Sequence, residues 1–326
     1  MEPKIPFPPM RFDDLSTYPL AERDSKVTVR DFGRTWKPGG GFAAFLDTLP
    51  RVLAGADIRE VIEAVCTSVR GGHRVVMAMG AHVIKVGLNP LVIDWMERGI
   101  LTAVAMNGAG IIHDMELAMA GKTSEDVAAG LGSGAFGMAR ETGRFLSKAV
   151  QDAKRSGCGL GEAVGQAILD QRLPLAEHSI LAAGARLGIP VTVHVAMGTD
   201  ILHIHPDFDP GAAGAASHRD FRILASVVAG LENGVYLNVG SAVVLPEVFL
   251  KVLTAVRNLG HTVRRFTAVN MDFIRHYRPH TNVVTRPTAE GGRGIHLTGH
   301  HEILFPLLAA GVIEALSADP GGATAG

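Results

Sequence analysis

The sequence predicts an α/β fold built on a doubly wound parallel sheet. From about residue 74 to residue 317, short runs of apolar, β-forming residues alternate with segments of helical spacing. Most of the strand-like runs end on a glycine and a small polar residue, at Gly80, Gly108, Gly198, Gly240 and Gly299. The chain has 326 residues and is 47% hydrophobic, so it can bury a large core.

The chain begins with a segment that does not share this pattern. Residues 1–41 hold many prolines and charges and the triplet Gly39-Gly40-Gly41, which favours an extended arm over the surface or over a neighbouring subunit. Residues 42–69 then predict two helices. Asp57 would cap the second helix, with Glu60 three residues later completing a capping box.

Six strands and their helices follow in regular order. The predicted strands are 75–81, 100–106, 189–196, 235–239, 262–269 and 294–297, with helices near 89–98, 111–119, 246–259 and 301–316. A helical insertion is expected at about 124–170, with a break at 156–159. The α/β domain therefore covers 42–317, and the Gly/Ala-rich residues 318–326 are expected to form a flexible tail.

The most informative unit is the strand, glycine turn and helix of residues 100–119. Glycines at such a turn let the backbone approach a ligand, and the helix N-terminus behind them offers free N–H groups. His113 lies in the first helical turn, where its side chain can face the same crevice. In open parallel sheets the ligand binds beyond the carboxyl ends of the strands.

Several other side chains are candidates for that crevice. His113, Asp200, His205 and Glu247 could share acid and base roles. Lys85 is either an anion-binding or nucleophilic amine or a surface lysine. Six arginines crowd the last third and suit a phosphate or carboxylate, or acids at a subunit interface: Arg264, Arg265, Arg275, Arg278, Arg286 and Arg293.

Two motifs allow alternative interpretations. Gly132-Ser133-Gly134-Ala135-Phe136-Gly137 matches the dinucleotide pattern G-x-G-x-x-G, but it follows a helical stretch, which favours a helix break over a phosphate loop. His203, His205 and Asp207, with the His300 region, could instead bind a metal ion in a metal-dependent enzyme. Chance clustering is the competing interpretation, because the chain has 14 histidines.

Composition narrows the class of protein. The net charge of -1 does not indicate a basic surface for binding nucleic acid. The only two cysteines, Cys66 and Cys158, argue against a disulfide scaffold or a cysteine metal cluster. No signal peptide and no stretch long enough to span a bilayer is apparent. A cytoplasmic protein without a membrane partner is expected.

Taken together, the strand-end motifs resemble those of the deoxyhypusine synthase family. The similarity runs from Met79-Gly80 through Asn107–Asp114, Gly198–His205 and Gly240–Val244 to Leu304–Leu308. It implies a Rossmann-like homotetramer, a dimer of dimers, that binds NAD at subunit interfaces and transfers an aminoalkyl group from a polyamine. By the resemblance, Asp200 matches a polyamine-binding aspartate, and the expected cofactor-binding residues are Gly80, Asn107, Gly108, Ala109, Gly110, Asp114, Gly240, Ser241, Gly299 and His300.

One departure changes the expected reaction. The family's catalytic lysine lies between the fifth and sixth strands, whereas here the last lysine in the chain is Lys251. A lysine imine cannot form at that place. We therefore expect not a true deoxyhypusine synthase but a diverged NAD-dependent transferase or oxidoreductase acting on a small amine or an anionic metabolite. A non-catalytic ligand-binding scaffold is the remaining alternative.

Overall fold

A computed structural model describes residues 7–318 and confirms the predicted fold class. All strands of its six-stranded sheet are parallel, in the order β3-β2-β1-β4-β5-β6. The strands are β1 (Val75–Met79), β2 (Ala103–Asn107), β3 (Val191–His194), β4 (Val235–Val239), β5 (Thr267–Asp272) and β6 (Arg293–Thr298). Because the chain winds outward from β1 and then outward again from β4, the direction of winding reverses between these two central strands.

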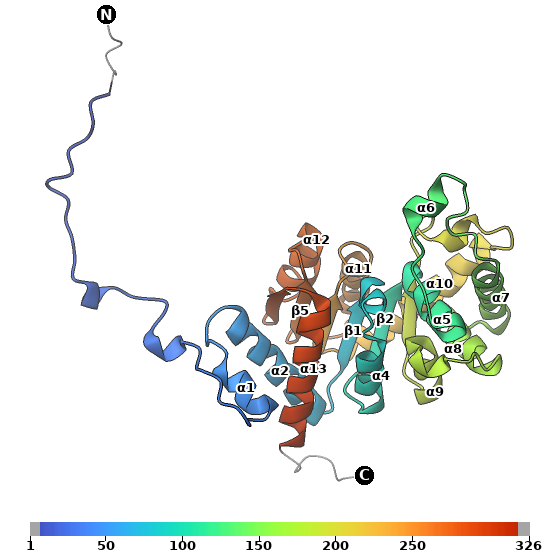
Figure 1. Ribbon diagram of the computed structural model, residues 1–326, viewed down its shortest axis with the longest axis horizontal. Helices are drawn as coiled ribbons and strands as arrows, with labels where there is room; N and C mark the ends of the chain where they lie inside the picture. Colours follow the sequence, from blue (N-terminus) through green and yellow to red (C-terminus); the bar gives the residue numbers. More distant parts are fainter. Residues whose placement is uncertain (1–6, 319–326) are drawn as a thin grey trace, which may run out of the picture.

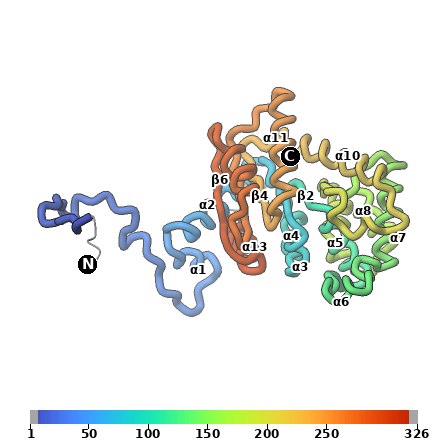
Figure 2. Tube along the Cα trace, turned by 90° about the horizontal axis from the view of Figure 1, so that it is seen from above, coloured from blue at the N-terminus to red at the C-terminus, as the bar shows by residue number. Residues whose placement is uncertain are grey.

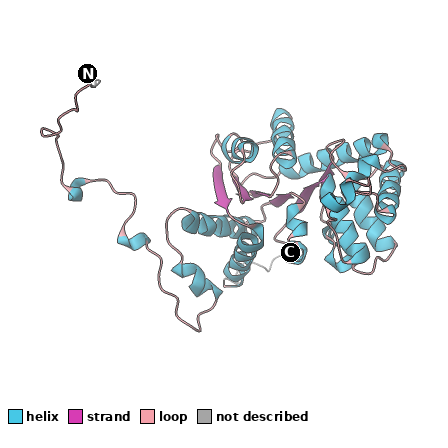
Figure 3. Ribbon diagram, turned by 45° about the horizontal axis from the view of Figure 1, so that its top comes forward, coloured by secondary structure: helices cyan, strands magenta, loops and turns pink. Residues whose placement is uncertain are grey.

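Helices cover both faces of the sheet (Figure 3). One face packs against α2 (Ala54–Arg70), α4 (Asn89–Glu97), α5 (Gly108–Ala120) and α13 (His301–Ser317). The other packs against α10 (Pro210–Val228), α11 (Val244–Asn258) and the short π-helical segment η5 (His280–Thr285). Alternate residues of β1 follow this division, since Val75, Met77 and Met79 belong to the first core and Val76 and Ala78 to the second.

The remaining helices extend the molecule at its two ends. α6 (Val127–Leu131), α7 (Arg140–Ser156), α8 (Leu160–Asp170) and α9 (Ile180–Leu187) lie at one end of the molecule (Figure 1). The first three fall within the range predicted for the helical insertion, and the chain breaks before Leu160 as expected. Short segments α3 (His82–Lys85), α12 (Tyr277–Pro279), η3 (Ala176–His178) and η4 (Ile201–Ile204) connect the larger elements. At the opposite end, α1 (Phe42–Thr48) packs on α13.

The arm contains two single turns, η1 (Leu20–Glu22) and η2 (Val29–Asp31), and leads away from the sheet (Figures 1 and 2). None of its described residues is buried, and Phe12, Leu15 and Leu20 each expose about two thirds or more of their surface. The predicted flexible tail falls almost entirely on residues 319–326, outside the described part of the chain. None of the described helices combines the length and the hydropathy that a membrane span requires.

Two local predictions were wrong. α2 begins at Ala54, three residues before the expected cap Asp57, because Leu53 adopts a left-handed φ of 48° and turns the chain there. The fifth strand begins at Thr267 and includes Asn270–Asp272, which were expected to follow it. Its register explains the shift: Thr267 pairs with Val235 of β4 and with Arg293 of β6, and residues 262–266 precede the sheet.

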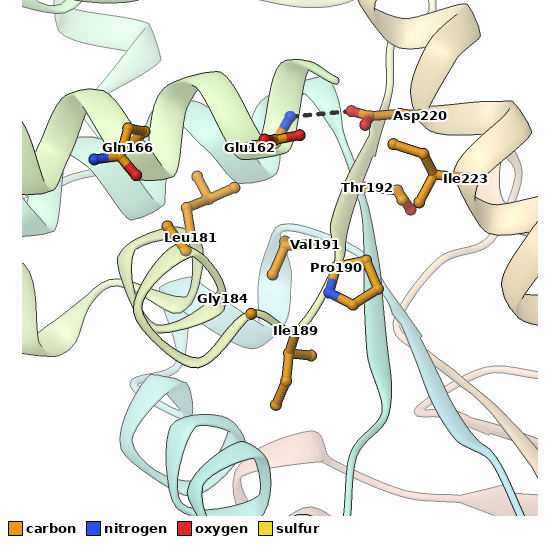
Figure 4. Close-up of a pocket in the computed structure, with 13 residues that line it drawn as sticks. Glu162, Gln166, Leu181, Gly184, Ile189, Pro190, Val191, Thr192, Asp220 and Ile223 are labelled. Carbon is orange, nitrogen blue, oxygen red and sulfur yellow. Dashed lines mark hydrogen bonds between the residues drawn. The ribbon is translucent and has the colours of Figure 1, made fainter. Parts of the chain in front are cut away.

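The free edge of β3 is closed by side chains of α10. Asp220 accepts hydrogen bonds from the backbone N–H of Gly161, at 3.0 Å, and of Val193, at 2.8 Å, and Ser217 accepts one from Val195 at 3.0 Å. Figure 4 shows Asp220 at one end of a cavity of about 350 Å³ between α8, α9 and β3. The carboxylate thus pairs the edge of β3 and the N-terminus of α8, which would otherwise leave buried N–H groups unpaired.

Asp220 should make stability depend on pH. Burial raises the pKa of Asp220 to about 7, against about 3.9 in an unfolded chain. The folded state then retains a proton that the unfolded state releases, so its free energy of unfolding falls as pH rises from about 4 to about 7. The Asp220→Asn variant has no titrating group at this position, so its free energy of unfolding lacks this pH dependence. We expect the difference between the two proteins in urea unfolding to change by up to about 4 kcal/mol across this window; a constant difference would contradict the raised pKa.

Candidate functional site

The strand-end turns of β1 and β4 meet where the winding of the sheet reverses. A Cβ added to Gly80 would lie 2.0 Å from the carbonyl oxygen of Gly240, so the two turns touch through their backbones. Gly240 has a φ of 66°, which L side chains rarely adopt. In sheets of this strand order, ligands bind beyond the carboxyl ends of the strands at this position. Gly80, Gly240 and Ser241, all predicted cofactor-binding residues, lie there.

Four aromatic rings lie close to one another, with His301 against Gly240, and we call them the switch-point cluster: His82, Phe273, His300 and His301. The ring of His301 lies 5.4 Å from that of His82, and Phe273 stacks on His300 with centroids 6.2 Å apart. His301 is fully buried, and its Nε2 lies 3.2 Å from the carbonyl oxygen of Met271. Since only an N–H can donate to that oxygen, Nδ1 carries a lone pair, and it is buried without a partner. Burial lowers the pKa of His301, which favours the neutral ring.

A pocket of about 210 Å³ lies at the carboxyl ends of β2 and β3. Three residues predicted as catalytic, Lys85, His113 and Asp200, line this pocket together with the predicted cofactor-binding Ala109. Two further acids, Glu116 and Glu125, also line it. Three carboxylates therefore face one lysine, which favours a cationic ligand over an anionic one. We call this space the amine pocket.

Asp200 is held against the N-terminus of α5. A Cβ on Gly108 would lie 2.0 Å from Asp200 Oδ2, so only glycine leaves room for the carboxylate. That oxygen is buried and lacks a hydrogen-bond partner. Burial raises the pKa of Asp200. A buried carboxylate oxygen without a donor is costly, and a ligand ammonium group would supply the missing donor.

His113 is half-buried on the first turns of α5. Its Nδ1 lies 2.6 Å from the hydroxyl oxygen of Thr123. Burial lowers the pKa of His113, the charge of Lys85 lowers it further, and the charge of Glu116 opposes both. The neutral imidazole is therefore favoured near pH 7, which is the form that a general base requires.

The structure does not bring all five predicted catalytic residues together. Glu247 lies on α11, accepts a hydrogen bond from Asn282 at 2.9 Å and pairs with Arg278 at 3.2 Å, and it does not line the amine pocket. His205 packs against Gly143 of α7, with its Nδ1 buried. Lys85 is exposed, so the desolvation that would activate it as a nucleophile is absent. The expected convergence of His113, Asp200 and Glu247 is thus wrong for Glu247.

Several predicted cofactor-binding residues have structural roles instead. Asp114 is fully buried and caps α9, where it accepts hydrogen bonds from Ser179, Ile180 and Leu181. A Cβ on Gly110 would meet the side chain of Met106, so this glycine permits close packing of α5 on its own strand. Asn107 caps α5 by accepting the N–H of Gly110 at 3.1 Å. Gly299 lies between β6 and α13, next to His300 of the switch-point cluster.

The alternative motifs are not supported by the geometry. Among residues 7–318, no three His, Cys, Asp or Glu side chains are grouped to hold a metal ion, and His203 instead accepts the backbone N–H groups of Gly198 and Asp200. Residues 132–137 form a loop between α6 and α7 with no strand before it. The arginines mostly pair with acids of the same chain: Arg264 with Glu290, Arg265 with Glu232, Arg278 with Glu247 and Arg293 with Glu60.

Sequence reasoning missed Glu116, Thr123 and the role of His301. Glu116 lies three residues after His113 on α5, so helical spacing alone places the two side chains on one face. Thr123 follows α5 and Phe273 follows β5, and no spacing in the sequence predicts the contacts of either residue. His301 lies in the first turn of α13, where side chains are often solvated, but it is fully buried, and a Cβ on Gly240 would lie 3.0 Å from its ring.

Comparisons with known proteins support the fold. No protein-family model and no curated protein matches the chain. An Entamoeba histolytica protein considered to be a deoxyhypusine synthase aligns with a TM-score of 0.50 and 10% identity, over 87% of this chain and 97% of that one. A cysteine-to-alanine mutant of AgrE with L-arginine gives a TM-score of 0.50 and 17% identity, over 82% of this chain and 34% of AgrE.

A ternary complex of AgrE with ornithine and NAD+ gives a TM-score of 0.49 and 15% identity, over 80% of this chain and 33% of that one. This chain thus spans about a third of AgrE. At these identities the similarities show a shared α/β fold and no more.

Proposed function

We propose that this protein is an NAD-dependent oxidoreductase that acts on a small amine. The observation that carries the proposal is the amine pocket, where the partnerless oxygen of Asp200 lies near a neutral His113. The absence of a lysine after Lys251 argues against aminoalkyl transfer through a late lysine imine, so oxidation without transfer is the simpler reaction.

The switch-point cluster fits a nucleotide. Gly80 and Gly240 leave no room for a side chain between the two turns, and the buried Nδ1 of His301 lacks a donor. Phe273 exposes 46% of its surface beside His300 and offers a flat face for a base. The segment α3 joins the two places, with His82 in the cluster and Lys85, one helical turn later, at the amine pocket.

Each residue of the amine pocket would have a separate role in this reaction. Asp200 would bind the substrate ammonium and hold the adjacent carbon in place. His113 would take one proton from the nitrogen through Nε2. NAD+, when bound, supplies the hydride acceptor. The substrate ammonium thereby loses a hydride from its carbon and one proton from its nitrogen, a carbon–nitrogen double bond forms, and the product is an iminium ion. Lys85 at the mouth of the pocket would select substrates that carry a second, anionic group.

The direct test is identification of ligands released from the native protein, followed by an assay of NAD+ reduction with a panel of small amines. We expect the protein to retain NAD or to bind it when it is added, and we expect at least one amine to reduce NAD+, which is measured as an increase in absorbance. His113→Gln should reduce turnover by about 100-fold or more, whereas His218→Gln, at an exposed position on α10, should not. Tight amine binding without NAD binding or reduction would leave a non-catalytic sensor as the function.

We further propose that the arm packs on a second copy of the chain in a homotetramer. Single exposed apolar residues are common on protein surfaces. The arm, however, exposes many apolar side chains and has no core of its own, so we expect another protein surface to cover them. Replacing Phe12, Leu15 and Leu20 by serine should reduce the mass in light scattering to a smaller multiple of 34.4 kDa. Leu259→Ser, at an equally exposed position after α11, is the matched control. An unchanged mass would exclude the arm from the interface.

A further inference from the structure

A chain of hydrogen bonds links His113, at the amine pocket, to Thr123, Glu116 and Thr142. His113 Nδ1 contacts Thr123 Oγ1 at 2.6 Å, and Thr123 Oγ1 contacts Glu116 Oε2 at 2.5 Å. The second oxygen of Glu116, Oε1, accepts the hydroxyl of Thr142 at 2.9 Å. Thr142 is buried on α7, so the chain is anchored on a second helix.

The proton count gives this chain a direction. A threonine hydroxyl has a single proton, and an ionised carboxylate can only accept. Thr123 must therefore donate to Glu116, and its remaining lone pairs can only accept from His113. Neutral His113 then carries its proton on Nδ1 and leaves a lone pair on Nε2, because the partner of one ring nitrogen decides the state of the other.

We propose that Thr123 and Glu116 are positioning residues that fix His113 as a proton acceptor through Nε2. This rests on the proposed function only for the identity of the proton donor, an amine nitrogen bound at Asp200. In the step, one N–H bond of the ammonium breaks and an Nε2–H bond forms, giving an imidazolium. Glu116 then stabilises the new positive charge through the hydroxyl of Thr123, much as a carboxylate orients the histidine in a catalytic triad.

The surroundings of His113 are consistent with this role. The titratable and charged groups around it are Lys85 from α3, Glu116 from its own helix, Glu125 from the loop before α6, and Asp200 from the turn before η4. Glu116 is the one that shares a hydrogen-bonded path with the imidazole. Glu125 is engaged elsewhere, since it accepts the N–H of Gly137 at 2.9 Å.

The first test is spectroscopic and needs neither substrate nor cofactor. In the full-length protein labelled with nitrogen-15, long-range proton–nitrogen spectra distinguish protonated from unprotonated ring nitrogens, and the His113→Gln spectrum identifies the signals. We expect Nδ1 protonated and Nε2 unprotonated in the wild type. Thr123→Val should shift the population towards the Nε2–H form, Thr123→Ser should restore the wild-type pattern, and Thr254→Val, on the outer face of α11, should change nothing.

The second test follows the pKa of His113 and the pH profile. Without the charge of Glu116, burial and Lys85 lower the pKa of His113 unopposed, so Glu116→Gln should move the acid limb of the rate profile to lower pH. Thr123→Val should lower kcat by about tenfold or more. An Nε2–H tautomer in the wild type, or an unchanged tautomer in Thr123→Val, overturns the proposal. A confirmed tautomer in a protein that oxidises no amine would overturn only the proposed function.

Discussion

Asp200→Asn is expected to weaken the binding of a small ammonium ligand by about 10- to 100-fold. A hydrogen bond to a charged group contributes about 1.5–3 kcal/mol, and the substitution removes the charge while nearly preserving shape. Oδ2 of Asp200 has no donor within the protein, so the wild type gains more from a ligand donor than a satisfied carboxylate would. Titration calorimetry with a series of alkylamines, diamines and matching carboxylates would measure this.

The pH dependence of that binding has a definite sign. Burial raises the pKa of Asp200, and the ammonium binds to the ionised carboxylate. Affinity should therefore fall as pH drops through this raised pKa, and it should not do so in Asp200→Asn. Asp47→Asn, at an exposed position on α1, serves as the control. If carboxylates bind more tightly than amines, or if Asp200→Asn leaves amine affinity intact, the amine pocket has been assigned the wrong ligand class.

Asp114→Ala is expected to produce the largest loss of stability, about 3–5 kcal/mol. Its carboxylate receives hydrogen bonds from Asn89, Ser179, Ile180 and Leu181, joining α4, α5 and α9 at one buried point. Removal leaves these donors buried and unpaired, each at a cost of about 1–3 kcal/mol. Burial raises the pKa of Asp114 to about 6, so Asp114→Asn should cost less than Asp114→Ala at low pH.

Urea unfolding of both variants would measure this loss. Asp94→Ala breaks the exposed pair with Arg98 and should cost at most about 1 kcal/mol, which makes it the matched control. A stable Asp114→Ala variant that fails to bind NAD would instead return Asp114 to the cofactor site, where the resemblance to deoxyhypusine synthases had placed it.

The sequence by itself determined the parallel α/β fold and predicted that the candidate site lies at the carboxyl ends of the strands. Apolar runs and helical spacing indicate which residues are buried. In a parallel sheet, which is covered by helices on both faces, this burial does not depend on exact contacts between segments far apart in the sequence. The glycines Gly80, Gly108 and Gly240 were identified from their places at strand ends, and in the structure a Cβ there would meet the backbone of Gly240, the carboxylate of Asp200 and the ring of His301, respectively.

Only the tertiary structure decided which side chains share a pocket. His113 and Asp200 are brought together because β2 and β3 are neighbours, whereas Glu247 follows β4 and turns towards η5. Asp114 and His113 are adjacent in sequence, yet α5 directs one into the core and the other into the amine pocket. Hydrogen bonds such as those of Thr123 join residues whose contact depends on loop geometry, which no local pattern in the chain encodes.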